Sequence, residues 1–313
     1  MCDEMLDVYG KWEELFAQAE KIEMPHVEAK EKVFYSGIGG SGIAGDMVNL
    51  LDPKFHYEVL RNLPTVPHHV GKDSLVIAVS YSGNTRETAR TFTNALSRGA
   101  SGVIMASGGK LEEYAKKKSI PFVKIAPAGM QPRVAFPLLL VPVLKLLNDT
   151  FSMGYDIHDL YRGVVESKDC AREAEKVAGS INGKIPVAYA SKYLPIAKRF
   201  KQQINENCKY PAYYGEIPEI YHNEVEGYKR EMNLFPLLIG DDSLDEVVCE
   251  IVKPYKIKPR FKSVMKNISG LVYLVDIISI YLANKIGEDP YSIEAIKKVK
   301  AATNVIIDKN LSL

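Results

Sequence analysis

The stretch Leu75-Val76-Ile77-Ala78-Val79, followed by Ser80-Tyr81-Ser82-Gly83-Asn84-Thr85, decides the fold class of this chain. An unbroken apolar run of this length is typical of a strand buried in a parallel sheet. The residues that follow predict a helix with a polar face, and the first turn of a helix offers unpaired N–H groups and a positive dipole end to an anion. We therefore predict that a strand, a loop and a helix start bind a phosphate group, with Ser80, Ser82 and Thr85 as ligands.

Strand and helix patterns alternate along most of the chain, which is typical of parallel βαβ units. We predict an α/β protein of two domains, residues 1–153 and 154–313, each with a mainly parallel sheet flanked by helices and with the connection between them in 155–184. The expected strands are Val33–Ser36, Tyr57–Leu60, Leu75–Ser80, Gly102–Ala106, Phe122–Ile125, Pro186–Ala190 and Phe235–Ile239. The expected helices are Met5–Ile22, Ile43–Leu51, Thr85–Ser97, Leu111–Lys118, Val134–Leu147, Pro195–Asn205 and Lys262–Lys285.

Composition argues against several classes of protein. The chain has 313 residues, of which 46% are hydrophobic, which is enough for the cores of two ordinary domains. Its 40 lysines and arginines balance 39 acidic residues, so we expect no nucleic-acid partner. The apolar stretch Leu271–Ala283 contains Asp276, so we expect no membrane span. Four cysteines without CxxC spacing, and no visible secretory signal, favour a cytoplasmic protein with reduced thiols.

A glycine-rich turn follows the first expected strand, and one interpretation is a dinucleotide site. Gly37, Gly39 and Gly42 have the G-x-G-x-x-G spacing between a strand and a helix, which would suit an NAD(P)-dependent dehydrogenase. Such a site needs an acid at the end of the second strand. Glu58 lies within that strand rather than clearly at its end, which weakens this interpretation.

The other interpretation of this turn is a site for a smaller ligand. The backbone N–H groups around Gly39, Gly40 and Ser41 approach the carboxyl edge of the sheet, where open parallel sheets bind ligands. The loop Ser80–Thr85 follows another strand of the same expected sheet. Two hydroxyl-bearing turns would then face one crevice, which favours a phosphorylated small molecule, although helix capping is the ordinary role of a Ser or Thr at such positions.

Five motifs occur in the order found in one protein family. They are GIGGSGIAGD at Gly37–Asp46, SYSGNTRET at Ser80–Thr88, Pro132-Arg133, NENCKYPAYYGEIPEIYHNEVEG at Asn205–Gly227, and the closing helix Ile293–Lys300. Together they resemble the archaeal-type bifunctional phosphoglucose/phosphomannose isomerases of the sugar isomerase (SIS) superfamily, over nearly the whole chain. The resemblance implies two SIS domains, a homodimer, no metal and no cofactor. It also implies interconversion of glucose 6-phosphate, mannose 6-phosphate and fructose 6-phosphate.

The implied reaction moves a carbonyl between C1 and C2 of the sugar through a cis-enediol. It needs a base for the proton beside the carbonyl, an acid/base group for ring opening, and a cation beside the developing negative charge. The resemblance assigns the base to Glu206, ring opening to His222 and stabilisation of the charge to Arg133. It further implies that His222 reaches the active site of the neighbouring subunit.

Two positions near the C-terminus complete the site that the resemblance implies. Lys300 best matches the lysine of the C-terminal helix that assists ring opening, and Lys297, on nearly the same helix face, is the alternative. Ser292 matches, by residue type only, the small hydroxyl residue that the family associates with acceptance of both C2 epimers. We expect activity on glucose 6-phosphate and leave the preferred epimer open.

A phosphosugar-binding regulator without catalytic activity is the main alternative from another class. Such a protein has no need for Glu206, His222 and Arg133 together with a C-terminal lysine. No helix-turn-helix segment or basic arm is evident in the sequence. We therefore favour an isomerase over both a regulator and a dehydrogenase.

Overall fold

The computed structural model describes residues 1–61, 66–125, 129–230 and 232–308, and it divides into two compact units. Unit 1 contains Met1–Glu13 and His158–Ser292, and unit 2 contains Glu14–Ile157 and the described residues from Ile293 on. This division differs from the expected 1–153 and 154–313 at both ends of the chain, because the first helix packs against α11 (Val264–Ile286) of unit 1 and the last helix against α4 (Arg86–Ser97) of unit 2. A hydrophobic pattern predicts a helix but does not say which core receives it.

Unit 2 is built on a five-stranded parallel sheet with the order β2-β1-β3-β4-β5. All residues of β3 are buried, as its apolar run predicts. The strand order reverses between the neighbours β1 and β3, which is the point where open parallel sheets bind ligands. The strands are β1 (Lys32–Ser36), β2 (His56–Leu60), β3 (Ser74–Ser80), β4 (Ser101–Ala106) and β5 (Phe122–Lys124).

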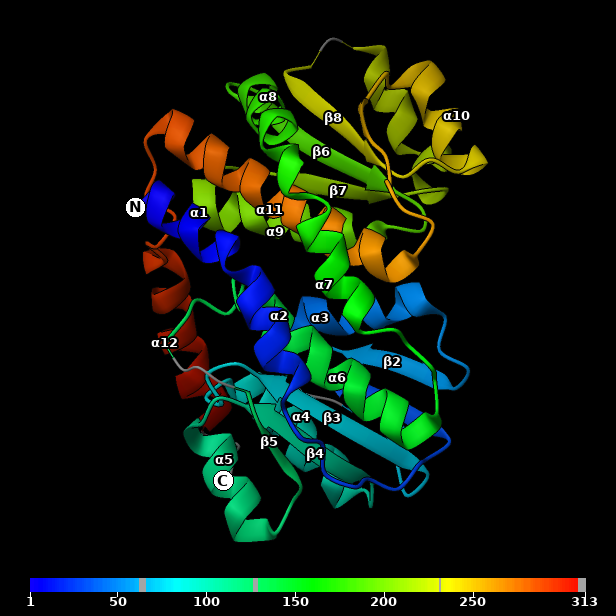
Figure 1. Cartoon of the computed structure of the whole chain (residues 1–313), viewed down its shortest axis with the longest axis vertical. Coiled ribbons are helices and arrows are strands. Elements are labelled where there is room, and N and C mark those ends of the chain that lie inside the picture. Colours follow the sequence, from blue (N-terminus) through cyan, green and yellow to red (C-terminus); the bar gives the residue numbers. More distant parts are fainter. Residues whose placement is uncertain (62–65, 126–128, 231, 309–313) are drawn as a thin grey trace. The chain divides into compact units, whose positions relative to one another are not determined.

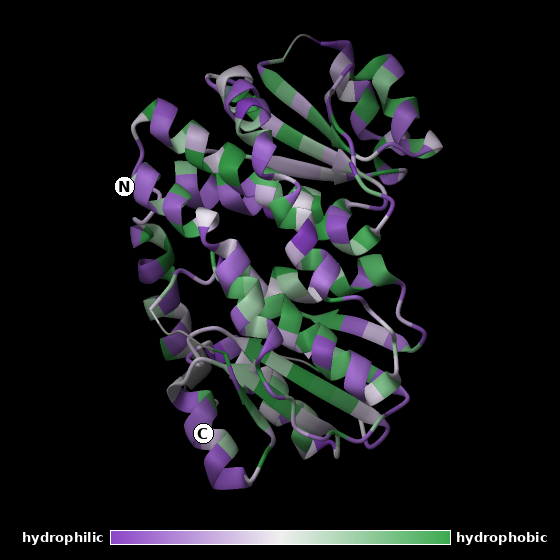
Figure 2. Cartoon of the chain, viewed as in Figure 1, coloured by the Kyte–Doolittle hydropathy of each residue, from purple (hydrophilic) through white to green (hydrophobic). Residues whose placement is uncertain are grey.

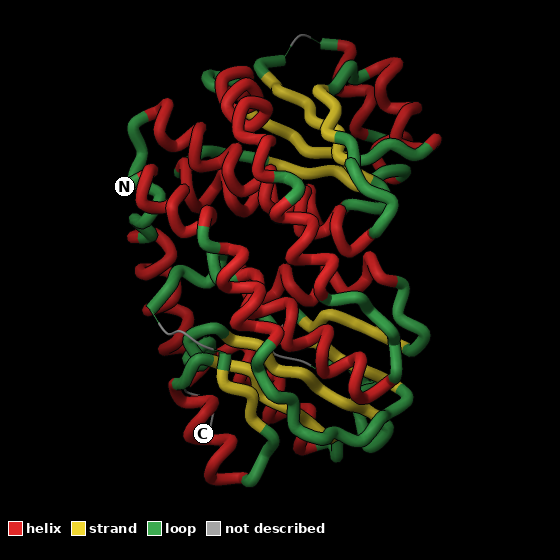
Figure 3. Tube along the Cα trace, in the orientation of Figure 1, coloured by secondary structure: helices red, strands yellow, loops and turns green. Residues whose placement is uncertain are grey.

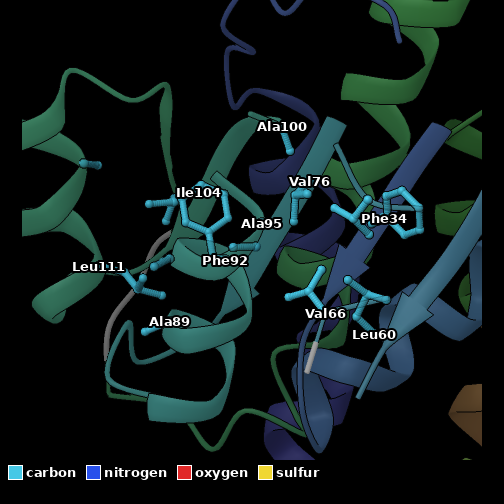
Figure 4. Packing of buried hydrophobic residues seen from close by; sticks show 14 residues of the cluster. Phe34, Leu60, Val66, Val76, Ala89, Phe92, Ala95, Ala100, Ile104 and Leu111 are labelled. Carbon is cyan, nitrogen blue, oxygen red and sulfur yellow. The ribbon is translucent and has the colours of Figure 1, made fainter. Parts of the chain in front are cut away.

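Helices cover the sheet of unit 2 (Figure 1). A cluster of buried side chains joins α4 and α5 to the sheet, with Phe92 of α4 packed among residues such as Phe34 and Ile104 (Figure 4). The predicted buried helix within Val134–Leu147 is present as α6, and α12 packs against α4. The helices are α2 (Trp12–Glu20, counted with unit 2 from Glu14), α3 (Gly40–Val48) with the 3₁₀ turn η1 (Asn49–Leu51), α4 (Arg86–Ser97), α5 (Gly109–Lys118), α6 (Phe136–Phe151) and α12 (Glu294–Asp308).

Unit 1 contains a second parallel sheet, with the order β7-β6-β8-β9 (Figure 3). Its strands are β6 (Ile185–Ala190), β7 (Tyr213–Glu216), β8 (Leu234–Ile239) and β9 (Tyr255–Ile257). Its helices are α1 (Cys2–Gly10), α7 (His158–Val165), η2 (Lys168–Cys170), α8 (Ala171–Ile181), α9 (Leu194–Cys208), η3 (Glu219–His222), η4 (Glu224–Lys229), α10 (Ser243–Ile251) and α11 (Val264–Ile286). Both units therefore have an α/β fold with parallel strands flanked by helices.

The core helix of unit 1 is α11, which packs against α1, α7, α8 and α9. By length and composition it could span a membrane, but 83% of its most apolar window is buried inside the structure. It appears largely apolar in Figure 2. Its one acidic residue, Asp276, accepts hydrogen bonds from the guanidinium of Arg199 at 2.8 and 2.5 Å, and both side chains are buried. Burial and a paired charge are what a core helix requires.

The structure confirms the expected strands and, with one exception, the expected helices, with ends shifted by a few residues. The exception is Met5–Ile22, which is broken at Lys11 into α1 and α2. The strands β7 and β9 were not predicted. Both lie at edges of their sheet, and β7 has mostly exposed side chains, so neither has the apolar run of a central strand.

Candidate functional site

The two predicted phosphate-binding loops follow β1 and β3, and the structure joins them directly. The backbone N–H of Tyr81 donates to Ser41 Oγ at 3.0 Å, which links the loop after β3 to the first turn of α3. Gly40 lies against the backbone of Pro132 and Arg133, since a Cβ on Gly40 would be 2.9 Å from Pro132 C and Arg133 N. Three segments far apart in sequence thus meet at the carboxyl ends of β1 and β3, and we call this place the anion edge.

Two helices begin at the anion edge, and within the described residues neither start has a side-chain cap. Helix α3 begins after Gly39, which has φ +60°, and α4 begins after Thr85. Thr85 Oγ1 does not cap α4 but accepts a hydrogen bond from Ser80 Oγ at 2.9 Å. The first-turn N–H groups of both helices are therefore donors that a phosphate can accept from, and both helix dipoles favour its charge.

The hydroxyl groups of the anion edge divide into two kinds. Ser41 and Ser80 are 5% and 1% exposed, and their hydrogen bonds hold the loops in place. Ser82 is exposed and its Oγ accepts from the N–H of Asn84 at 3.3 Å, so it retains its own proton. Thr85 is an acceptor in its bond with Ser80 and also retains a proton. Ser82 and Thr85 therefore have hydroxyl protons that they can donate to a ligand.

Two further contacts fix the backbone of these loops. Burial raises the pKa of Tyr35, so its hydroxyl stays protonated and donates to the carbonyl of Ser41 at 2.5 Å. Gly83 has φ +66°, and a Cβ there would lie 1.7 Å from the carbonyl oxygen of Gly108. Only glycine fits such a position, and its N–H donates to Ser80 O at 2.9 Å to close the turn. The loop that presents Ser82 is thus held by packing on the neighbouring strand's loop.

Thr88, in the first turn of α4, was not singled out in the sequence. It is 1% exposed, and its Oγ1 is one of two buried side-chain polar atoms that have no hydrogen-bond partner among the described residues. A buried hydroxyl without a partner is costly, and a ligand or a water at this helix start is one way to satisfy it. Thr88 closes the motif at Ser80–Thr88, but its spacing from Thr85 is common in ordinary helix starts and does not mark it as a ligand.

Arg133 is buried beside the anion edge, with 4% of its surface exposed. Its Nη1 donates to Gln131 Oε1 at 3.3 Å, and its backbone packs on Gly40 as described above. A guanidinium stays protonated and can bond two oxygens at once. The structure therefore places the predicted cation in the same unit as the predicted phosphate loops.

The dinucleotide interpretation does not fit the second strand. Glu58 is in the middle of β2, and its Oε2 lies 3.0 Å from His69 Nε2 and 3.7 Å from His56 Nε2. At the carboxyl end of β2 the residue after Leu60 is Arg61, which pairs with Asp46 of α3. This position therefore lacks the acid that would contact the ribose of NAD, and its arginine is held by Asp46 rather than offered to the 2′-phosphate of NADP.

Glu206 belongs to unit 1 and lies in the last turn of α9, where it is half-buried. The helix ends at Lys209, which has φ +51° and whose Nζ donates to the carbonyl of Glu206 at 3.1 Å. The neighbouring amide of Asn207 is buried and donates to Ser279 Oγ of α11 at 2.8 Å. The helix end that carries Glu206 is thus fastened to the core helix of its unit.

His222 is exposed at the end of η3, also in unit 1. The segment around it is held on both sides, because Ile220 is buried and the carboxylate of Glu224 accepts from Tyr189 OH at 2.6 Å. Burial raises the pKa of Tyr189, so this hydroxyl remains a donor. An exposed imidazole thus stands on an anchored loop.

The C-terminal candidates fall in different units. Lys300 is exposed on α12, in unit 2 with the anion edge, whereas Ser292 is the last residue of unit 1. The alternative Lys297 forms an ion pair with Glu294 at 2.8 Å. Within unit 2 the structure brings the predicted loops together with Arg133, and within unit 1 it fixes the elements that carry Glu206 and His222.

Comparison with known proteins identifies relatives along the whole chain. Residues 171–302 match the bacterial phospho-glucose isomerase C-terminal SIS domain. A D-glucosamine-6-phosphate 4-epimerase from Sulfolobus acidocaldarius is 36% identical over 97% of this chain and 99% of its own length. A bifunctional phosphoglucose/phosphomannose isomerase from Aquifex aeolicus is 33% identical over 86% of this chain and 89% of its own length.

Solved structures share the fold at low sequence identity. A hypothetical protein from Thermus thermophilus has a TM-score of 0.75 at 14% identity and covers 97% of this chain and 89% of its own. The C-terminal domain of glucosamine-fructose-6-phosphate aminotransferase from Francisella tularensis has a TM-score of 0.71 at 13% identity, covering 91% and 97%. These likenesses support the fold alone. The sequence relatives go further, and by them the chain belongs to the bifunctional phosphoglucose/phosphomannose isomerase family of the SIS superfamily.

Proposed function

We propose that this protein is an isomerase that interconverts glucose 6-phosphate, and also mannose 6-phosphate, with fructose 6-phosphate. The observation that carries the proposal is the anion edge, where two helix starts without side-chain caps and the hydroxyls of Ser82 and Thr85 suit a phosphate monoester. Relatives over most of the chain are named bifunctional phosphoglucose/phosphomannose isomerases. The regulator and the dehydrogenase are accordingly set aside.

The proposed chemistry needs no cofactor. Glu206 removes the proton beside the carbonyl and returns it to the neighbouring carbon, so that the carbonyl moves between C1 and C2 through a cis-enediol. His222 exchanges the proton of the ring oxygen during ring opening, with Lys300 assisting, and Arg133 stabilises the negative charge of the enediolate. The family resemblance supports these roles, and the anchored positions of Glu206 and His222 suit them.

We also propose a cytoplasmic homodimer in which His222 serves the partner's active site. The exposure of His222 on an anchored loop supports a role outside its own unit. We further infer that the sheet of unit 2 is a second SIS domain, because its strand order β2-β1-β3-β4 corresponds to the order β7-β6-β8-β9 of the sheet in the matched C-terminal region. Ser292 is proposed to bear on the choice of C2 epimer.

A coupled assay with both aldose phosphates tests the proposal, and Glu206→Gln tests the base. Loss of a general base lowers turnover by about 10²- to 10⁴-fold, while the phosphate contacts and hence substrate affinity remain. Glu250→Gln is the matched control, since Glu250 is exposed on α10. Failure of the wild-type protein to form any aldose phosphate from fructose 6-phosphate would refute the isomerase, and full activity of Glu206→Gln would refute the assigned base.

A second candidate is epimerisation at C4 of an amino sugar phosphate. The specific observation is the relative named D-glucosamine-6-phosphate 4-epimerase, which is more similar than the isomerase from Aquifex aeolicus and matches over a larger share of both chains. The anion edge suits either substrate, because both are 6-phosphates. Proton NMR of glucosamine 6-phosphate incubated with the protein separates the candidates, because inversion at C4 makes H4 equatorial and lowers its couplings to H3 and H5. Aldose–ketose isomerisation instead removes the proton at C2 and leaves the configuration at C4 unchanged.

A further inference from the structure

Three metal-ligating side chains gather on β2, away from the anion edge. They are His56, Glu58 and His69, and their ligand atoms all lie within 4.8 Å of one another. Glu58 Oε2 is 3.0 Å from His69 Nε2 and 3.7 Å from His56 Nε2, so both imidazoles approach the same carboxylate oxygen. Neither the comparisons with relatives nor the proposed isomerisation gives these residues a task.

The fold explains how the three side chains meet. His56 and Glu58 are two residues apart on a strand, so they project from the same face, and β2 is an edge strand of its sheet. His69 arrives from the described part of the following connection. There Arg98 Nη1 donates to the carbonyls of Val66 and Pro67 at 2.7 Å each. The imidazole of His69 is thus delivered by a segment fastened to unit 2.

An apolar floor orients the two imidazoles. Phe34 of β1 is paired in register with Glu58, and its ring centroid lies 5.6 Å from that of His56 and 5.5 Å from that of His69. Phe34 is fully buried in the same hydrophobic cluster as Leu60 (Figure 4). The group of His56, Glu58 and His69 thus rests on packed apolar side chains on one side. On the other side, His56 and His69 are about half exposed, at 49% and 47%. A cation can therefore enter from solvent.

We propose that His56, Glu58 and His69 bind a divalent transition metal ion, with Zn²⁺ the best fit. Tetrahedral zinc with bonds of about 2.0–2.2 Å places neighbouring ligand atoms about 3.3–3.5 Å apart. The two separations from Glu58 Oε2, 3.0 and 3.7 Å, lie on either side of that value, so shifts of a few tenths of an ångström bring both pairs to it. The ligand atoms of all three side chains lie within 4.8 Å of one another. Two imidazoles and one carboxylate suit zinc and its neighbours better than Mg²⁺ or Ca²⁺, which prefer oxygen ligands alone. Three protein ligands leave one position for water.

The site would act on the stability of unit 2. His56 is the first residue of β2, whereas the anion edge lies at the carboxyl ends of the neighbouring strands. The metal would tie the connection that carries His69 to the edge strand that carries Glu58. Lys32 lies near this cluster, since its Nζ donates to the carbonyl of His69 at 3.5 Å, and the same Nζ is held by Asp73 Oδ2 at 2.7 Å, which reduces its repulsion of a bound ion.

Titration of the chelator-treated full-length protein with Zn²⁺, followed by calorimetry, tests the proposal. We expect one site per chain that weakens at least ~10-fold in His69→Ala and in Glu58→Gln. His68→Ala is the matched control, because His68 is the adjacent exposed histidine outside the cluster, and it should bind as the wild type does. Equal affinities of His68→Ala and His69→Ala, or no saturable binding, would overturn the proposal.

Co²⁺ provides an independent readout that separates this site from the cysteines. Imidazole and carboxylate ligands give tetrahedral visible bands without a sulfur-to-cobalt charge-transfer band, whereas a thiolate site at Cys2 or Cys249 adds that band. Thermal unfolding gives a third readout: Zn²⁺ should raise the Tm of the wild type with increasing concentration, and should raise that of Glu58→Gln less at the same concentration. A charge-transfer band, or an equal rise in Tm for Glu58→Gln, would place the metal elsewhere and refute the site. None of these measurements depends on isomerase activity.

Discussion

The two sheets have the same order of their first four strands, yet the places where that order reverses differ at one of their two helix starts. In unit 2, between β1 and β3, helices α3 and α4 begin without a side-chain cap among the described residues. In unit 1, between β6 and β8, α9 likewise begins without a side-chain cap, but α10 begins with a capping box made by Asp242 and Asp245. Ser191 Oγ donates to Asp242 Oδ2 at 2.8 Å, and the N–H of Ser191 donates to Asp245 Oδ1 at 3.1 Å.

The difference teaches that topology alone does not make an anion site. Both places offer strand ends and helix N-termini, but in unit 1 two carboxylates of the protein already accept the N–H groups that an external anion would need. In unit 2 the corresponding acceptors are absent from the described residues around Thr85, and hydroxyl groups stand there instead. We therefore expect one phosphate site per chain, at the anion edge.

The largest expected effect comes from placing a carboxylate at the anion edge, as unit 1 has at the start of α10. Ser82→Asp puts a carboxylate on the exposed loop before α4, and repulsion of the phosphate should weaken phosphosugar binding by about 100-fold or more. Ser82→Asn is the matched neutral control and should lose only a single hydroxyl contact. Binding of a phosphosugar, measured by calorimetry, distinguishes them, and equal affinities of the two variants would contradict the location of the phosphate site.

A smaller effect is expected from removing the side-chain cap of α10 in unit 1. Asp242→Ala removes the cap of α10 and the acceptor of Ser191 Oγ, so it should reduce the free energy of unfolding by about 1 kcal/mol. Asp241→Ala is the control, because Asp241 is exposed and takes no part in the capping box. Urea unfolding measures both variants. Equal stability of the two would mean that the carboxylate of Asp242 does not hold this helix start.

The sequence predicted the sheet of unit 2 well because its strands have distinct signals. The run from Leu75 to Val79 is short, fully apolar and rich in valine and isoleucine, which favours a buried strand, and the residues after it are those of a ligand-binding loop. In unit 1 the short strands β7 and β9 lack that signal, since exposed tyrosines at Tyr213 and Tyr214 resemble a loop. Strand prediction thus works where burial on both faces forces an apolar run.

The hydrogen-bond partners of individual side chains could not be predicted from the sequence. Thr85 and Asp242 are both good N-cap residues, yet Thr85 bonds to Ser80 and only Asp242 caps its helix. Glu58 was weighed as a contact for a ribose, and its partner His69 comes from a separate segment whose path no local pattern reports. The assignment of the first helix to unit 1 and of the last helix to unit 2 was also not predictable, because it depends on tertiary packing.

The smallest expected effect is a pH dependence of stability that comes from Asp245 in the capping box of α10. Burial raises the pKa of Asp245 above its ordinary value of 3.8, and hydrogen bonds from Ser191 partly oppose that rise. Because the folded state holds this proton more tightly than the unfolded state, Asp245 contributes stability at low pH that is lost as the pH rises through the raised pKa. Asp245→Asn cannot titrate but keeps an acceptor oxygen for Ser191. The stability of Asp245→Asn relative to the wild type should therefore improve between about pH 4 and pH 7 in urea unfolding. If the stability difference between Asp245→Asn and the wild type is constant, or worsens toward neutral pH, then ionised Asp245 does not destabilise the fold. The start of α10 would then differ from the anion edge in its helix cap alone.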